Sequence, residues 1–169
     1  MIALIGYGSI GQANFATEAV AFYLTAYMIT SLAAFSLLSI ISGESESDSL
    51  SDVQGLFWRR PLLALLLCIA MLSLAGIPLT AGFLAKFYML QAALSAKYGL
   101  VVVVIAVLMA AVSVYYYFRV LQAMYFRAAE EGAQFPAFST GLKSVLTLIA
   151  ILILVLGIQP GLLLHYLYF

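Results

Sequence analysis

The chain has 169 residues, of which 66% are hydrophobic and 8% charged, and its seven basic residues balance its seven acidic ones. Soluble domains carry about a quarter charged residues, so this chain has too few charges to cover a water-facing surface. The composition excludes a soluble enzyme domain and the basic surface of a nucleic-acid-binding protein. It predicts an all-α polytopic membrane protein whose surroundings are the lipid bilayer.

The hydrophobic runs predict one transmembrane domain with about four helices and a partial one, one of the helices being discontinuous. The segments are a partial span (1–14), a span (18–41), a polar loop (42–58), a discontinuous span (59–97), a span (100–127), a loop (128–139) and a last span (140–168). The first segment is too short to cross about 30 Å of hydrocarbon, which needs about 20 helical residues. It is therefore interpreted as the end of a span.

The segment 59–97 consists of two apolar halves on either side of Gly76-Ile77-Pro78. Proline lacks a backbone donor and clashes with the preceding turn, so the helix is predicted to break there. The halves form either one broken span or two short ones. With a single crossing, four basic residues fall on one side of the membrane and one on the other, which agrees with the positive-inside tendency. The four are Arg59, Arg60, Arg127 and Lys143, and the one is Lys97.

Lys86 follows the break and is the only charged residue between Arg60 and Lys97. Burial disfavours the charged form of a lysine, so such a group can gain and lose a proton as its surroundings change. Broken backbone in a membrane persists only where it is buried or lines a wet cavity. We therefore expect Thr80, Gly82 and the carbonyls before Pro78 to hold water beside the lysine.

The alternative for Lys86 is an anchor that extends to the membrane surface. It lies eleven residues from Lys97, or about 16 Å along a helix, which is too deep for that role. The pattern favours an ion-translocation site on a discontinuous helix, formed by Gly76, Pro78, Thr80 and Gly82 with Lys86 as the proton-transferring residue.

Three further residues are candidates for a proton path. Arg119 lies about 12 Å inside Arg127 along a helix and either extends to the surface or forms a fixed positive charge beside the path. Tyr116, one of three consecutive tyrosines, could add a hydroxyl. Glu18 is either a buried acid or, more simply, an interfacial residue at the edge of its span. The last span is interpreted as lipid-facing and structural.

No pattern for metal or cofactor binding is found. The single cysteine, Cys68, lies in an apolar run, and no carboxylate pair, His/Cys set or nucleophile triad occurs. Residues 6–11 match GxGxxG formally, but no βαβ unit follows them. We expect no metal and no cofactor on this chain.

Three motifs carry a resemblance to a known family: GLFWRRP at 55–61, LSLAGIPLTAGFLAKFY at 72–88 and YYYFRV at 115–120. Together they resemble subunit N of bacterial respiratory complex I, the counterpart of mitochondrial NADH dehydrogenase subunit 2. The resemblance implies an antiporter-like fold with two inverted repeats, and makes Lys86 the lysine of the discontinuous helix in the second repeat, which takes part in proton translocation. It implies other membrane-arm subunits as partners, in a bacterial inner membrane or an organelle's energy-transducing membrane. NADH, FMN, iron–sulfur clusters and quinone would be used by other subunits.

The family is much longer than this chain, which lacks the first repeat and resembles only the C-terminal part. We expect a fragment or a split subunit that does not form a complete proton path alone. Two alternatives stay open: a subunit of a multisubunit cation/proton antiporter, which shares the broken helix and lysine, and a truncated structural membrane piece. The coupled ion, proton or sodium, is not determined by the sequence.

Overall fold

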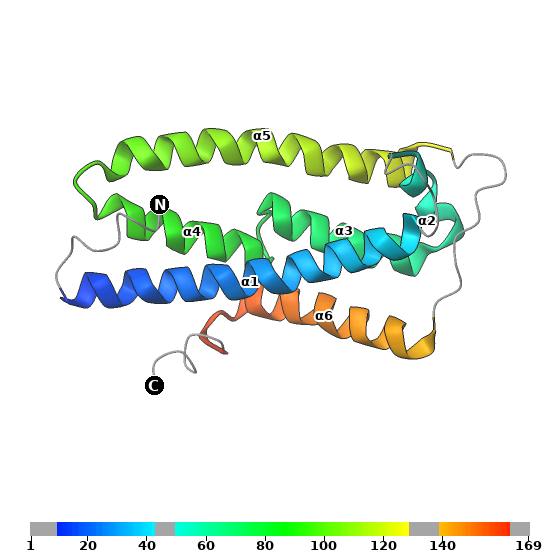
Figure 1. Cartoon of the computed structure of the whole chain (residues 1–169), viewed down its shortest axis with the longest axis horizontal. Coiled ribbons are helices and arrows are strands. Elements are labelled where there is room, and N and C mark those ends of the chain that lie inside the picture. Colours follow the sequence, from blue (N-terminus) through cyan, green and yellow to red (C-terminus); the bar gives the residue numbers. More distant parts are fainter. Residues whose placement is uncertain (1–9, 43–49, 129–138, 163–169) are drawn as a thin grey trace.

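The computed structural model describes residues 10–42, 50–128 and 139–162, and in these ranges every regular element is a helix. The long helices lie side by side with their axes roughly parallel (Figure 1). This confirms the predicted all-α membrane fold. The elements are α1 (Ile10–Ser42), the 3₁₀ turn η2 (Leu50–Val53), α2 (Leu56–Arg59), α3 (Pro61–Ala75), α4 (Ala81–Leu94), α5 (Gly99–Phe126) and α6 (Thr140–Ile158).

The helices α3 and α4 lie end to end between α1 and α5 (Figure 1). α3 has 15 residues and α4 has 14, whereas α5 alone has 28. At 1.5 Å per residue the two halves together match the length of α5, about 42 Å. They therefore form one discontinuous span, as predicted, rather than two short spans that fold back on each other.

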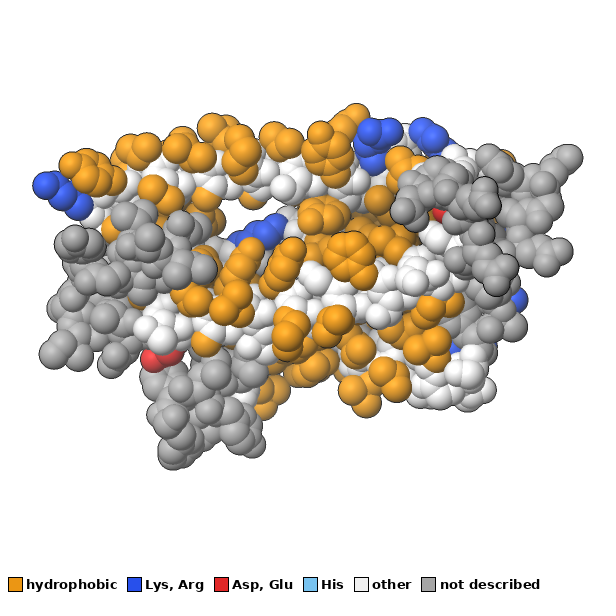
Figure 2. Space-filling model, viewed as in Figure 1, with side chains coloured by type: hydrophobic (Ala, Val, Ile, Leu, Met, Phe, Trp, Pro, Cys, Tyr) orange, Lys and Arg blue, Asp and Glu red, His pale blue; other side chains and the backbone are white. Residues whose placement is uncertain are grey.

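Three other helices are long and apolar enough to cross a membrane: Phe15–Ser42, Gly99–Phe126 and Thr140–Ile158. With the α3–α4 pair they make four spans in the described part of the chain. α1, α3, α4 and α6 share the buried core, whereas the outer side of α5 exposes valine, isoleucine and leucine side chains (Figure 2). Such a surface suits lipid or further helices.

Some predicted boundaries differ from the observed ones. Residues 10–14 are the start of α1, continuous with 18–41, and not part of a separate partial span, because nothing interrupts helical hydrogen bonding between them. The second part of the predicted loop 42–58 contains η2 and α2, where Val53 and Leu56 are buried. α6 ends at Ile158, before the predicted end of the last span. Residues 1–9, 43–49, 129–138 and 163–169 of the predicted segments lie outside the described residues.

Candidate functional site

The break between the two half-helices begins at a glycine. Gly76 has a φ of +84°, in the left-handed region that glycine adopts without steric cost. Its N–H donates to the carbonyls of Leu72 and Ser73, and the N–H of Ile77 reaches the carbonyl of Leu72 at 3.0 Å. These bonds form a Schellman motif. α3 therefore ends at Ala75 with Gly76 as its cap, before the proline that was predicted to break it, and Pro78 lies in the turn that follows.

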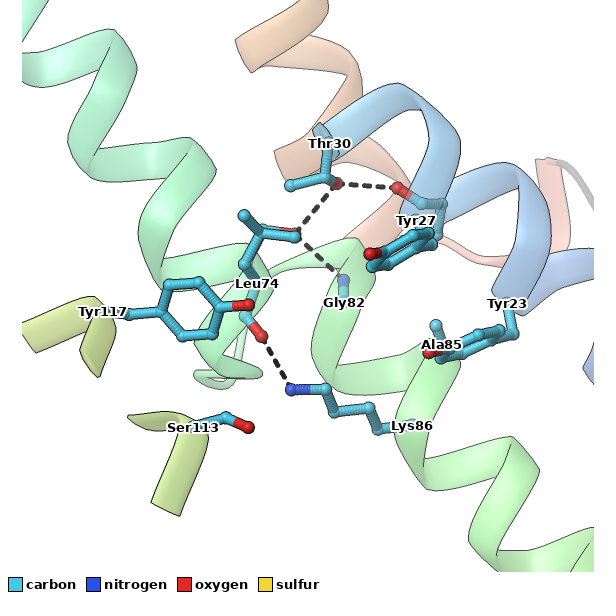
Figure 3. Close-up of a pocket in the computed structure, with 11 residues that line it drawn as sticks. Tyr23, Tyr27, Thr30, Leu74, Gly82, Ala85, Lys86, Ser113 and Tyr117 are labelled. Carbon is cyan, nitrogen blue, oxygen red and sulfur yellow. Dashed lines mark hydrogen bonds between the residues drawn. The ribbon is translucent and has the colours of Figure 1, made fainter. Parts of the chain in front are cut away.

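Lys86 caps the same helix end. The last four carbonyls of an α-helix have no partner within the helix. The glycine motif uses the first two, and Nζ of Lys86 donates to the other two, to Leu74 O at 2.7 Å and to Ala75 O at 3.0 Å. Figure 3 shows the bond to Leu74. Carbonyls at a helix C-terminus carry partial negative charge and favour a cation. Lys86 thus links α4 to α3, and it occupies carbonyls that were expected to hold water.

Ser73 and Thr30, each only 1% exposed, hold the start of α4. The N–H of Gly82 donates to Ser73 Oγ at 3.1 Å, and Ser73 Oγ lies 3.3 Å from Thr30 Oγ1. Thr30 in turn donates to the carbonyl of Ala26 at 2.7 Å. Because a hydroxyl has one proton, Ser73 must be the donor to Thr30. The resulting chain of hydrogen bonds joins α4, α3 and α1 (Figure 3).

The turn between the halves is strained and supported by α6. Leu79 has a φ of 75°, a left-handed conformation that costs a non-glycine residue about 1–2 kcal/mol. The Thr80 hydroxyl donates to the carbonyl of Ile77 at 2.7 Å and closes the turn. Gly157 of α6 lies against this backbone so closely that a Cβ there would overlap the carbonyl oxygen of Leu79. The glycine therefore allows α6 to hold the turn in place.

A cavity of about 160 Å³ lies beside Lys86. Hydroxyl groups from three helices line it, and they belong to Tyr23, Tyr27, Thr30, Ser73, Ser113 and Tyr117. Figure 3 shows Ser113 and Tyr117 on one side of the lysine ammonium and Tyr23 and Tyr27 on the other, and Figure 2 shows a hollow between α5 and the helices below it. A polar cavity of this size has room for a few waters.

Comparisons with known proteins agree with this geometry. The family described as "NADH:quinone oxidoreductase/Mrp antiporter, TM" matches residues 1–113, which are 113 of the 169 residues. The chain belongs to this family. The antiporter-like fold and the integral membrane location are thereby confirmed.

Two solved structures resemble this member of the NADH:quinone oxidoreductase/Mrp antiporter family. A chain of respiratory complex I from Thermus thermophilus with bound aureothin is 34% identical, with a TM-score of 0.71, over 87% of this chain and 33% of the solved one. A chain of the membrane-bound sulfane sulfur reductase, an archaeal respiratory membrane complex, is 25% identical, with a TM-score of 0.73, over 92% of this chain and 34% of the solved one. The chain thus spans about a third of the length of these relatives.

The structure brings most predicted site residues of this family member together. Pro78 and Thr80 lie in the turn, and Gly82 and Lys86 line the cavity. Gly76 also touches the lysine, since a Cβ there would come within 3.0 Å of Lys86 Cδ. Among the described residues, no group of three or more histidines, cysteines or acids could hold a metal ion.

Three predicted path residues lie elsewhere. Glu18, Tyr116 and Arg119 do not line the cavity. Tyr116 is 59% exposed, and the Arg119 guanidinium lies 6.0 Å from the Tyr115 ring centre, along a separate groove. Their place in a longer proton path stays a prediction.

The residues that the sequence interpretation missed are the hydroxyl-bearing side chains of α1 and α5. Tyr23 and Tyr27 are four residues apart, as are Ser113 and Tyr117, and this spacing places each pair on one face of its helix. From this spacing the sequence could have shown that the two hydroxyl groups of each pair lie on the same side of their helix. It could not have shown that both pairs face Lys86.

Proposed function

We propose that this chain is the C-terminal part of a subunit N-type, antiporter-like membrane-arm subunit of respiratory complex I. In this role it takes part in proton translocation coupled to NADH:quinone electron transfer. The family membership, the match to complex I over 87% of the chain, and the motifs at 55–61, 72–88 and 115–120 support the proposal. NADH, FMN, iron–sulfur clusters and quinone would be used by other subunits, and other membrane-arm subunits would be its partners. The membrane would be a bacterial inner membrane or that of an energy-transducing organelle.

Lys86 is the central protonatable residue of this proposal, and one observation carries it: Nζ lies between the end of α3 and the polar cavity. A charged lysine has three N–H donors, and two of them bond to Leu74 and Ala75. The third remains for water in the cavity. Charge-assisted hydrogen bonds are about twice as strong as neutral ones, so loss of the proton would weaken the link between α3 and α4. Proton transfer at Lys86 would therefore change how firmly the two half-helices are held.

The test is NADH-driven proton pumping in membrane vesicles that contain the full assembly, with Lys86→Ala and Lys86→Arg. Assembly is checked on native gels. We expect both variants to assemble and to lose pumping and NADH–quinone turnover together, because arginine keeps the charge but does not release its proton. Lys97→Ala, which removes an exposed lysine in the turn between α4 and α5, is the matched control.

Normal pumping by an assembled Lys86→Ala complex would show that the lysine is an anchor. Normal pumping by Lys86→Arg, with loss in Lys86→Ala, would show that a fixed charge is enough and that Lys86 itself does not exchange protons.

The second candidate is a subunit of a multisubunit cation/proton antiporter. The family description supports it as well as complex I, because it names the Mrp antiporter beside NADH:quinone oxidoreductase. A gene neighbourhood with iron–sulfur and flavin subunits supports complex I, and one with small antiporter subunits supports the alternative. A truncated structural piece is the third possibility, and a normally pumping Lys86→Ala complex would favour it.

A further inference from the structure

A second hollow lies at one end of α5 and shares no lining residue with the cavity beside Lys86. It is a groove of about 680 Å³ between α3 and α5, within the usual size range of ligand sites. Phe118, Tyr125 and Phe126 give it an apolar wall, and Arg119 and Gln122 add the polar groups. The groove therefore combines a large apolar surface with one cation.

No carboxylate lines this groove among the described residues. The sequence from Val53 to Ala129 contains no aspartate or glutamate at all. The Arg119 guanidinium lies over the ring of Tyr115 at 6.0 Å, a cation–π contact that brings no negative charge to the arginine. An anionic partner would stabilise a cation on an apolar membrane surface, and the described residues of the groove do not supply one.

The position of Arg119 along α5 corresponds to the lipid headgroup region. Residues 98–118 are uncharged, and about 20 helical residues cross the hydrocarbon layer. If Lys97 lies at one membrane surface, Arg119 is the first charge at the other. Basic side chains also gather at this end of α5 (Figure 2), and by the positive-inside tendency this end faces the cytoplasm or its equivalent.

We propose that this groove binds an anionic phospholipid, with the phosphate on Arg119 and Gln122 and an acyl chain against Phe118 and Phe126. A guanidinium matches a phosphate with two parallel hydrogen bonds, and basic pockets between transmembrane helices bind anionic lipid headgroups. An acyl chain of the lipid would pack against the apolar wall and bury it. This site does not depend on proton translocation.

Cys68 provides a local probe, because it lines the groove and is the only cysteine of the chain. The full assembly in neutral detergent is titrated with phosphatidylglycerol or with zwitterionic phosphatidylcholine. Labelling of Cys68 by N-ethylmaleimide is then followed in the mass of its peptide. We expect phosphatidylglycerol to slow the labelling at concentrations at which phosphatidylcholine does not.

Arg119→Gln should weaken this protection about fivefold, the effect of one basic residue on anionic lipid. Arg127→Gln removes a cation from the same end of α5 but outside the groove, and should change the protection by phosphatidylglycerol less than twofold. Equal effects of the two variants would overturn the proposal in favour of general surface attraction. Equal protection by both lipids would also overturn it.

Discussion

Replacing Ser73 with alanine tests whether a side chain of α3 holds the start of α4. The change removes the acceptor of the Gly82 N–H, at 3.1 Å, and the hydroxyl 3.3 Å from Thr30. Ser73 is 1% exposed, so water does not readily replace the lost hydroxyl. A buried donor without a partner costs about 1–3 kcal/mol. That cost corresponds to roughly 5- to 150-fold faster hydrogen exchange at the Gly82 amide.

The assay is hydrogen exchange of the assembled complex, read by mass spectrometry on the peptide that covers the start of α4. Ser39→Ala, an exposed serine of α1, is the matched control and should leave this peptide unchanged. Because α4 carries Lys86, we also expect Ser73→Ala to reduce pumping. Unchanged exchange at Gly82 would refute the role of Ser73 as a cap. Faster exchange with normal pumping would limit that role to stability.

Two further pairs of variants test the turn and the cavity. Gly157→Leu should destabilise the packing of α6 on Leu79 by about 1–3 kcal/mol through overpacking and lower the amount of assembled complex on native gels, whereas Gly141→Leu, which meets no atom within 4 Å, should not. Equal yields would contradict the close approach of α6. Tyr117→Phe removes a cavity hydroxyl and should slow pumping about fivefold, the effect of one hydrogen bond of about 1 kcal/mol. Tyr98→Phe removes the hydroxyl of an exposed tyrosine at the other end of α5 and should pump normally, so an equal loss in both would exclude a specific role for Tyr117.

The spans and the break could be predicted because each rests on a local property of the sequence. Hydropathy and length identify α1, α5 and α6 as membrane helices. Gly76 and Pro78 cannot both continue a helix, so the position of the break follows from residue type alone. Lys86 could be identified because placing a lone charge in an apolar membrane segment costs free energy. A lysine in such a position is therefore a candidate functional residue.

The surroundings of Lys86 could not be predicted in the same way. α5 is apolar on nearly every side, so its sequence does not show which face turns toward α4. For the same reason the sequence could not show that Tyr117 lines the cavity beside Lys86 and Tyr116 does not, since neighbouring residues on a helix point about 100° apart. The cap on Gly82 comes from Ser73, nine residues earlier and on the other half-helix, and only the packing of α3 against α4 brings the two together.

The hydrogen bonds of the break give Lys86 a structural and a chemical role at once. Two of the four free carbonyls of α3 are satisfied by the glycine motif and two by Nζ, so an amine that moved away would leave the carbonyls of Leu74 and Ala75 unpaired. In lipid an unpaired backbone group costs several kcal/mol. Because the cavity lies beside these carbonyls, water there can replace the amine and lower that cost. A lysine that moves during proton transfer therefore needs a hydrated cavity at the end of α3, and variants that make the cavity apolar should fix Lys86 in place.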